Sequence, residues 1–137
     1  MFPGPLNWDG AQAQCISQGA NLASIHNQEE YDFVLGNPMQ LYTNWLLSVM
    51  LILNWERKCL FSGLTTARVF WLGGSDSQVE DDWAWADQVS PWAFSPWDTA
   101  NGQPNDNGVQ DCLVSLNSLW HDSRCPELLP FLCRKDL

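Results

Sequence analysis

The chain has few basic residues and lacks the cysteine spacing of a small zinc or redox site. Lys and Arg number 6 against 16 Asp and Glu among 137 residues, so the net charge is −10 at pH 7. This charge argues against nucleic acid and anionic membranes as partners. None of the five cysteines belongs to a C-x-x-C pair, which argues against a zinc knuckle or a thioredoxin-type redox site.

The chain also lacks the features of a hydrolase and of a secretory leader. It has two histidines and no serine or cysteine nucleophile motif, so the neighbouring His121 and Asp122 do not by themselves indicate acid–base catalysis. We therefore expect a binding module and not an enzyme. Met1 is followed by Phe-Pro-Gly-Pro, without a basic start or an apolar stretch. We interpret this as a truncated or processed start and not as a sign of the cytosol.

Acidic residues are concentrated in the second half of the chain. Between Val69 and Ser123 there are nine of them and no Lys or Arg. Any single one is expected to lie on a solvated face, but clustered carboxylates repel one another unless a cation joins them. Oxygen ligands of this kind suit Ca²⁺ better than zinc or copper. The nine are Asp76, Glu80, Asp81, Asp82, Asp87, Asp98, Asp106, Asp111 and Asp122.

The cysteines indicate an oxidising compartment. Four of the five can form two disulfide bonds, and such bonds persist in secreted and extracellular proteins. We therefore expect a secreted chain with one cysteine left over. The five are Cys15, Cys59, Cys112, Cys125 and Cys133.

The first 36 residues predict two helices. Asn7 can cap a helix over 8–18, which Gly19 is placed to end. Asn27, followed three residues later by Glu30, is typical of a capping box before a second helix over 28–35. Their expected inner faces consist of Trp8, Ala11 and Cys15 in the first helix and Tyr31, Val34 and Leu35 in the second.

From Val69 onward the pattern predicts short strands separated by turns and one long loop. The run 69–72 is apolar throughout and is followed by Gly73-Gly74, which is typical of a strand buried on both faces. The stretch 87–107 has no periodicity, and loops of that length in a compact domain are usually functional. Further strands are expected at 83–85, 111–116, 119–122 and 131–134. We expect Trp71, Trp83, Trp85 and Trp120 in the core and Trp92 and Trp97 beside the ligand loop.

Eight short motifs follow one another along the chain. They are Trp8-x-x-Ala11-x-x-x-Cys15, Gly19-Ala-Asn-Leu-Ala-Ser-Ile25, Trp71-Leu-Gly-Gly74, Gln103-Pro104-Asn105, Asp111-Cys112, Trp120-His-Asp122, Cys125 and Pro130-Phe-Leu-Cys133. Their order and spacing resemble the C-type lectin domain family over about residues 7–36 and 64–135. The resemblance implies an α+β fold in which two helices flank small mixed antiparallel sheets, with a long calcium-binding loop region. It also implies the disulfides Cys15–Cys133 and Cys112–Cys125 and a cis peptide bond at Gln103-Pro104.

The resemblance implies two calcium positions. The residues at the auxiliary position match the family's ligands well, whereas two residues at the sugar-binding position differ from them. There Gln110 stands in place of a Glu and His121 in place of an Asn, and imidazole is a poor ligand for hard Ca²⁺. The auxiliary position corresponds to Asp76, Glu80, Asp106 and Asp111, and the sugar-binding position to Gln103, Asn105, Gln110, His121 and Asp122.

Two parts of the chain depart from the family pattern within what we otherwise expect to be a single domain over 1–137. The opening strand is largely missing before Leu6, and residues 37–63 have no counterpart. The apolar stretch 41–55 would span about 22 Å as a helix, short of the ~30 Å of a bilayer core. We interpret 37–63 as an atypical insertion outside the domain core rather than a membrane anchor, with self-association as an alternative. Cys59, inside it, is expected to be free or to pair between chains.

Two function classes remain open. The first is a calcium-dependent carbohydrate-binding lectin module of a secreted protein. The second is a lectin-like domain that has lost sugar binding and recognises protein, or another surface such as ice, without calcium. The acid cluster and Gln103-Pro104-Asn105 favour the first class, and the substitutions at Gln110 and His121 favour the second.

Overall fold

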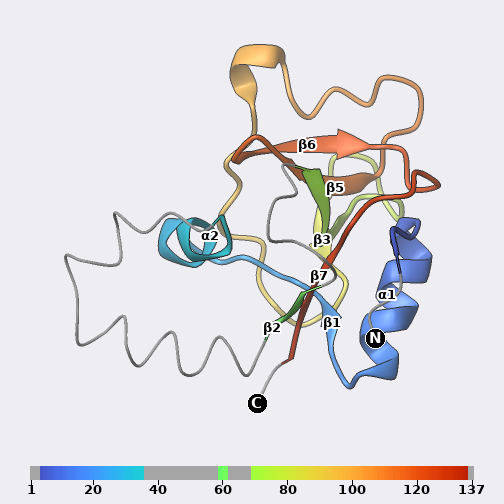
Figure 1. The fold of residues 1–137 in the computed structure, drawn as a ribbon. Coiled ribbons are helices and arrows are strands. Elements are labelled where there is room, and N and C mark those ends of the chain that lie inside the picture. The colour runs from blue at the N-terminus through green and yellow to red at the C-terminus, as the bar shows by residue number, and fades with distance from the viewer. Residues whose placement is uncertain (1–3, 36–58, 62–68, 136–137) are drawn as a thin grey trace.

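The computed structural model describes residues 4–35, 59–61 and 69–135. These residues form two α-helices, a 3-10 helix and two small antiparallel sheets, which is the expected α+β architecture (Figure 1). The helices lie on opposite sides of the strands, and the long loop lies at the end away from the C-terminus. In chain order the elements are α1 (Trp8–Ser17), β1 (Asn21–Leu22), α2 (Gln28–Val34), β2 (Cys59–Phe61), β3 (Val69–Ser75), β4 (Ala84–Trp85), the 3-10 helix η2 (Thr99–Asn101), β5 (Cys112–Leu116), β6 (Leu119–Ser123) and β7 (Leu132–Arg134).

The two sheets bring distant parts of the chain together. The smaller has the strand order β1-β7-β2 and the larger has the order β4-β3-β5-β6. Both disulfides implied by the resemblance are present: Cys15–Cys133 joins α1 to β7, and Cys112–Cys125 joins β5 to the segment after β6. In the chain-entropy model each such closure stabilises the fold by roughly 3–5 kcal/mol. The first and last elements are thereby held side by side.

Both predicted helices are confirmed, with ends within one residue of those expected. The side chain of Asn7 accepts the N–H of Gly10 at 2.8 Å, and that of Asn27 accepts the N–H of Glu30 at 2.9 Å. The second cap differs from a full capping box, because the Glu30 carboxylate accepts the N–H of His26 and not that of Asn27. Among the described residues, no helix is long and apolar enough to cross a membrane.

Strand β3 extends further than the sequence suggested. We expected it to end at Gly73-Gly74, but both glycines lie inside the strand, which continues to Ser75. A Cβ on Gly73 would lie 2.5 Å from the carbonyl oxygen of Leu22. A Cβ on Gly74 would lie 2.8 Å from a side-chain carbon of Leu113. The glycines therefore mark close packing within a strand and not its end.

Tryptophans form much of the core beneath the long loop. The four expected to be buried are buried, and Trp71 and Trp120 are fully enclosed. Trp92 and Trp97, expected beside the ligand loop, pack against this core. The ring centroids of Trp85 and Trp92 are 4.4 Å apart, and those of Trp83 and Trp97 are 4.9 Å apart. The loop is thereby anchored by its aromatic side chains.

The long loop also pairs with the edge strand of the larger sheet. The N–H of Trp120 donates to Pro96, and the N–H of Asp98 donates to Trp120, at 2.9 and 3.0 Å. A loop laid along β6 in this way satisfies backbone groups that an edge strand would otherwise leave open. Residues 96–98 and β6 are therefore fixed relative to one another, and both lead directly into the acidic region.

The segment 37–63 is not wholly outside the fold. Most of it lies beyond the described residues, but Cys59–Phe61 forms β2 and pairs with β7 along three residues. The expectation that the entire segment lies outside the core is therefore wrong for its last part. The backbone of β2 completes the three-stranded sheet at one edge.

Candidate functional site

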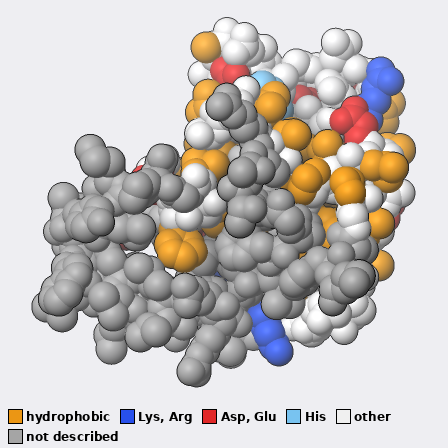
Figure 2. All heavy atoms as spheres, in the orientation of Figure 1, with side chains coloured by type: hydrophobic (Ala, Val, Ile, Leu, Met, Phe, Trp, Pro, Cys, Tyr) orange, Lys and Arg blue, Asp and Glu red, His pale blue; other side chains and the backbone are white. Residues whose placement is uncertain are grey.

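Five of the nine acidic residues of the second half line one open pocket. Its walls come from the turn after β3, from the long loop and from β6. On the face shown in Figure 2, few Asp or Glu side chains are visible among the coloured atoms. The pocket is lined by Asp76, Glu80, Asp81, Pro104, Asn105, Asp106 and Asp122.

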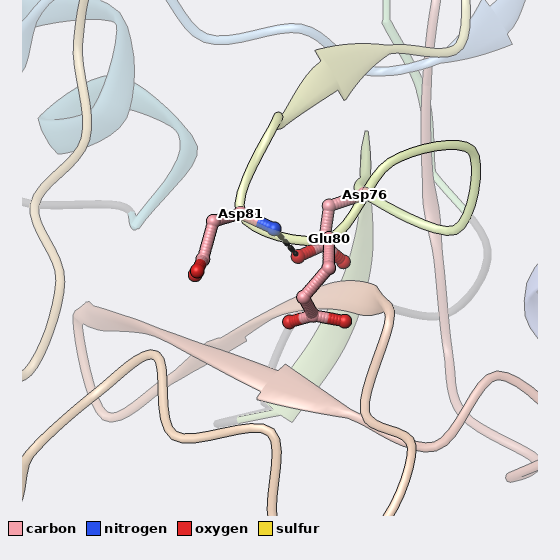
Figure 3. A group of neighbouring side chains, drawn as sticks. All are labelled: Asp76, Glu80 and Asp81. Atoms are coloured by element: carbon pink, nitrogen blue, oxygen red, sulfur yellow. Dashed lines mark hydrogen bonds between the residues drawn. The ribbon is translucent and has the colours of Figure 1, made fainter.

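Two overlapping groups of carboxylates lie within reach of a single cation each. The first contains Asp76, Glu80 and Asp81, which the turn after β3 brings together (Figure 3). The second contains Glu80, Asp106 and Asp111. Within each group, one oxygen per side chain lies within 4.8 Å of the others. Glu80 belongs to both groups and so links the turn to the long loop.

The pKa values of two of these acids, Asp76 and Glu80, are raised. The Asp76 side chain is only 4% exposed, and this burial, together with the charges of Asp111 and Asp81, raises the pKa of its carboxyl, against the effect of the Asp81 N–H that it accepts. Loss of hydration, with the charges of Asp106 and Asp76, raises the pKa of Glu80. Among the described residues, no Lys or Arg forms a salt bridge with a pocket acid.

In the part of the chain that the structure describes, two buried carboxylate oxygens have no hydrogen-bond donor. They are Oδ1 of Asp76 and Oδ1 of Asp122. Buried acceptors are normally paired, because an unpaired one costs about 1–3 kcal/mol. Unpaired carboxylate oxygens beside further carboxylates are the oxygen-only kind of ligand that Ca²⁺ takes. The residues present therefore fit a calcium ion.

Asp122 orders the loop that closes the pocket. Its Oδ2 accepts the N–H groups of Asn105 and Asp106, and its own N–H donates to Oε1 of Gln103 at 3.1 Å. The Gln103-Pro104 peptide bond is cis, as the resemblance implies. Three of the five residues predicted for the sugar-binding ion are thereby brought together.

Gln110 is drawn into the same loop through a tight turn. Oδ1 of Asp106 accepts the N–H groups of Val109 and Gln110. The N–H of Asn107 donates to Oε1 of Gln110 at 2.9 Å and to Oδ1 of Asn105 at 3.1 Å. The amide oxygens of Gln110 and Asn105 are thus held by one backbone group, next to the pocket carboxylates.

His121 is directed away from the other predicted ligands. Successive residues of a strand point to opposite faces, and on β6 the neighbouring Asp122 faces the pocket. The imidazole Nε2 of His121 lies 3.2 Å from Oδ2 of Asp98. That carboxylate is buried and also accepts Nδ2 of Asn101 at 2.7 Å. The side chain of His121 therefore belongs to a separate polar contact between β6 and the long loop.

Two acidic residues of this region were not predicted as site residues. Asp81 was recognised only as one acid among nine, yet it lines the pocket; its position depends on a left-handed backbone conformation, φ 65°, that the sequence does not signal. Asp98 was likewise counted but not assigned. Its partner is 23 residues further along the chain, so no local pattern could have revealed the pair.

Comparison with known proteins links the chain to one family. The model described as the lectin C-type domain matches residues 4–135. The chain is 34% identical over 137 residues to a type-2 ice-structuring protein from Osmerus mordax, a match that covers 97% of this chain and 62% of that protein. It is 30% identical over 137 residues to the galactose-specific lectin nattectin from Thalassophryne nattereri, covering 98% of this chain and 70% of the lectin.

Solved structures of two antifreeze proteins share the fold. A Ca²⁺-dependent type II antifreeze protein in its Ca²⁺-free form is 30% identical, with a TM-score of 0.68 and coverage of 98% of this chain and 87% of that one. A calcium-independent type II antifreeze protein is 27% identical, with a TM-score of 0.66 and coverage of 96% and 80%. Similar sequences on this fold thus include proteins described as calcium-dependent and as calcium-independent.

Proposed function

The chain belongs to the C-type lectin domain family, and from that premise we propose that it is a calcium-dependent carbohydrate-binding module of a secreted protein. The observation that carries the proposal is the pocket in which Asp76 and Asp122 each keep a buried carboxylate oxygen without a donor. Such a pocket is poorly suited to remain without a cation, because its acids repel one another. Family members are binding proteins and not enzymes.

The residues of the pocket divide into two roles. Asp76, Glu80, Asp106 and Asp111 would hold the first ion, with Asp81 as an added carboxylate at the same place. Asn105 and Asp122 would serve the ion nearer the ligand, with Gln103 and Gln110 as weaker oxygen donors. Bound calcium would supply coordination positions for sugar hydroxyls. The amide groups of Gln103 and Asn105 would then donate and accept hydrogen bonds with the same hydroxyls.

Isothermal titration calorimetry tests this proposal. Calcium is titrated into the metal-free chain, and galactose and mannose are then titrated with calcium or with EDTA. The proposal requires calcium binding, and a sugar signal that EDTA removes. Calcium binding without any sugar signal would refute the carbohydrate part alone, and no calcium binding would refute the whole.

A second candidate function is recognition of another surface, such as ice, without calcium. Its support is the contact between His121 and Asp98, which takes one expected ligand away from the pocket. The similarity to an ice-structuring protein and to a calcium-independent antifreeze protein adds to it. Microscopy of ice crystals grown in the presence of the protein would test it. Faceted growth that persists in EDTA would favour this candidate, and unaltered growth would remove it.

The proposed extracellular location rests on the two disulfides and on the relatives. Disulfides of this kind persist outside the reducing cytosol. The chain spans 62% of the length of the Osmerus mordax protein, so the role of a whole protein containing it is part of the proposal. Self-association through 37–63 stays a prediction, since most of that segment lies outside the described residues.

A further inference from the structure

The loop region that closes the pocket contains two Asn-Gly pairs. They are Asn101-Gly102, at the end of η2, and Asn107-Gly108, in the turn that holds Gln110. All four residues are exposed. An asparagine followed by glycine is prone to deamidation. Glycine has no side chain to keep its backbone nitrogen from attacking the carboxamide of the preceding asparagine.

The two pairs differ in how the carboxamide is held. Asn101 donates from Nδ2 to Oδ2 of the buried Asp98 at 2.7 Å. The carboxamide of Asn107 has no hydrogen-bond partner among the described residues; only its backbone N–H is engaged. Rotation of the Asn101 side chain therefore breaks a hydrogen bond to a charged group, whereas rotation of the Asn107 side chain breaks none.

The attacking nitrogen of each pair donates one hydrogen bond to the backbone. The N–H of Gly102 donates to the carbonyl of Thr99 at 3.1 Å, and the N–H of Gly108 donates to the carbonyl of Asp106 at 2.6 Å. Each must give up one such bond before it can react. Both glycines also have a left-handed backbone, with φ 75° and 80°. The difference in reactivity then follows from the asparagine side chains.

We propose that Asn107 is a site of spontaneous deamidation that modifies the ligand loop, while Asn101 is protected by Asp98. The backbone nitrogen of Gly108 loses its proton to solvent hydroxide and attacks Cγ of Asn107. The new C–N bond closes a succinimide ring, the Cγ–Nδ2 bond breaks, and ammonia leaves with a proton from water. Water then opens the ring at either carbonyl and yields aspartate or isoaspartate, so the net reaction consumes one water and releases one ammonia.

The isoaspartate product alters the turn beside the pocket. It places one extra carbon in the main chain between positions 107 and 108. That is inside the turn in which Oδ1 of Asp106 accepts the N–H groups of Val109 and Gln110. Asp106 then loses its orientation, and calcium binding weakens. This consequence rests on the proposed function, whereas the deamidation itself does not.

Peptide mapping by mass spectrometry tests the proposal on the full chain aged in mildly alkaline buffer without calcium. We expect conversion at Asn107 to be roughly tenfold or more faster than at Asn101, since one hydrogen bond to a charged group is worth about that factor. The Asp98→Ala variant, which frees the carboxamide of Asn101, should bring the Asn101 rate up towards that of Asn107. Equal rates in the unaltered chain, or an intact Asn107, would overturn the proposal.

Calcium titration of fresh and aged protein tests the consequence. The aged protein should bind calcium more weakly, and an aged Asn107→Gln variant should not change. The Asn107→Asp variant, which adds the charge without the extra carbon, should bind at least as well as the fresh chain. If Asn107 converts but neither sample binds calcium, the modification stands and the proposed function fails. If conversion leaves calcium binding unchanged, the regulatory consequence is refuted.

Discussion

At the scale of single residues, Asp76 and Glu80 occupy positions that oppose their own ionisation. Asp76 is buried and faces the charges of Asp111 and Asp81, so its pKa lies above the ordinary value of 3.8. Between pH 3.8 and the raised pKa, the folded metal-free protein therefore binds a proton at Asp76 that the unfolded chain has released. The stability from this group is present at low pH and is lost as pH rises from 3.8 through the raised pKa.

We predict that Asp76→Asn stabilises the metal-free domain at neutral pH. An amide cannot ionise, so the repulsion disappears and the decline in stability above pH 3.8 flattens. With calcium the order should reverse, because the variant lacks a carboxylate ligand. Urea denaturation across pH, in EDTA and in calcium, measures both effects. Asp82→Asn, an exposed acid of the same turn, is the matched control and should leave both curves nearly unchanged.

Gln110 and His121, the two residues that differ from the family pattern at the predicted sugar-binding ion, have different surroundings in the structure. Gln110 lies in the turn formed by Asp106, whereas His121 contacts Asp98. Gln110→Glu should therefore raise calcium affinity by adding charge to the ligand set. His121→Asn alone should change the free energy of binding by no more than about 0.5 kcal/mol, as for a residue outside the site. Calorimetric titration of both variants and the double variant checks this, and a large gain from His121→Asn would contradict the assignment.

At the scale of elements, local pattern predicted most of the secondary structure. Asn7 and Asn27 act as caps, and the three closing strands lie within one residue of the expected positions. The continuation of β3 through Gly73 was not predicted, because it depends on Leu22, which lies far away in the sequence. At the site, the position of Asp81 depends on its left-handed backbone, and the direction of His121 goes with its contact to Asp98; the sequence predicted neither. The sequence predicted which residue types the site contains. The direction of each side chain, however, is set by backbone conformation and by partners that are distant in the sequence.

Gly73 offers a direct test of the packing of β3 on β1. We predict that Gly73→Ala destabilises the fold by about 1–3 kcal/mol or more, because its Cβ would lie 2.5 Å from the Leu22 carbonyl oxygen. Gly102→Ala is the comparison, since it has open space and bears only the strain of its left-handed backbone, about 1 kcal/mol. Urea midpoints give both values. A smaller loss at Gly73 than at Gly102 would contradict the close approach.

At the scale of the whole molecule, the segment 37–63 divides into parts with different expected roles. Only Cys59–Phe61 is described, and it pairs with β7, the strand that carries the Cys133 end of a disulfide. Loss of these three residues removes one strand of the smaller sheet. A boundary between the insertion and the fold is therefore expected before Cys59 and not after 63.

We predict that deleting residues 37–58 leaves a folded domain, whereas deleting 37–63 lowers its stability. The shorter deletion keeps β2, and the longer one exposes the edge of β7. Circular dichroism and thermal unfolding of the two variants provide the comparison. If the shorter deletion abolishes folding, 37–58 is part of the domain. If both behave alike, β2 contributes nothing to stability.

The most direct test of calcium binding by the acidic pocket is thermal unfolding of the full chain with calcium and with EDTA. A ligand that binds only the folded state stabilises it by about 2.7 kcal/mol at about a hundred times its Kd. Calcium should therefore raise Tm by several degrees, magnesium at the same concentration should raise it less, and the gain should vanish in a variant with Asp76 and Glu80 changed to alanine. An unchanged Tm in calcium, or an equal rise in that variant, would contradict the account.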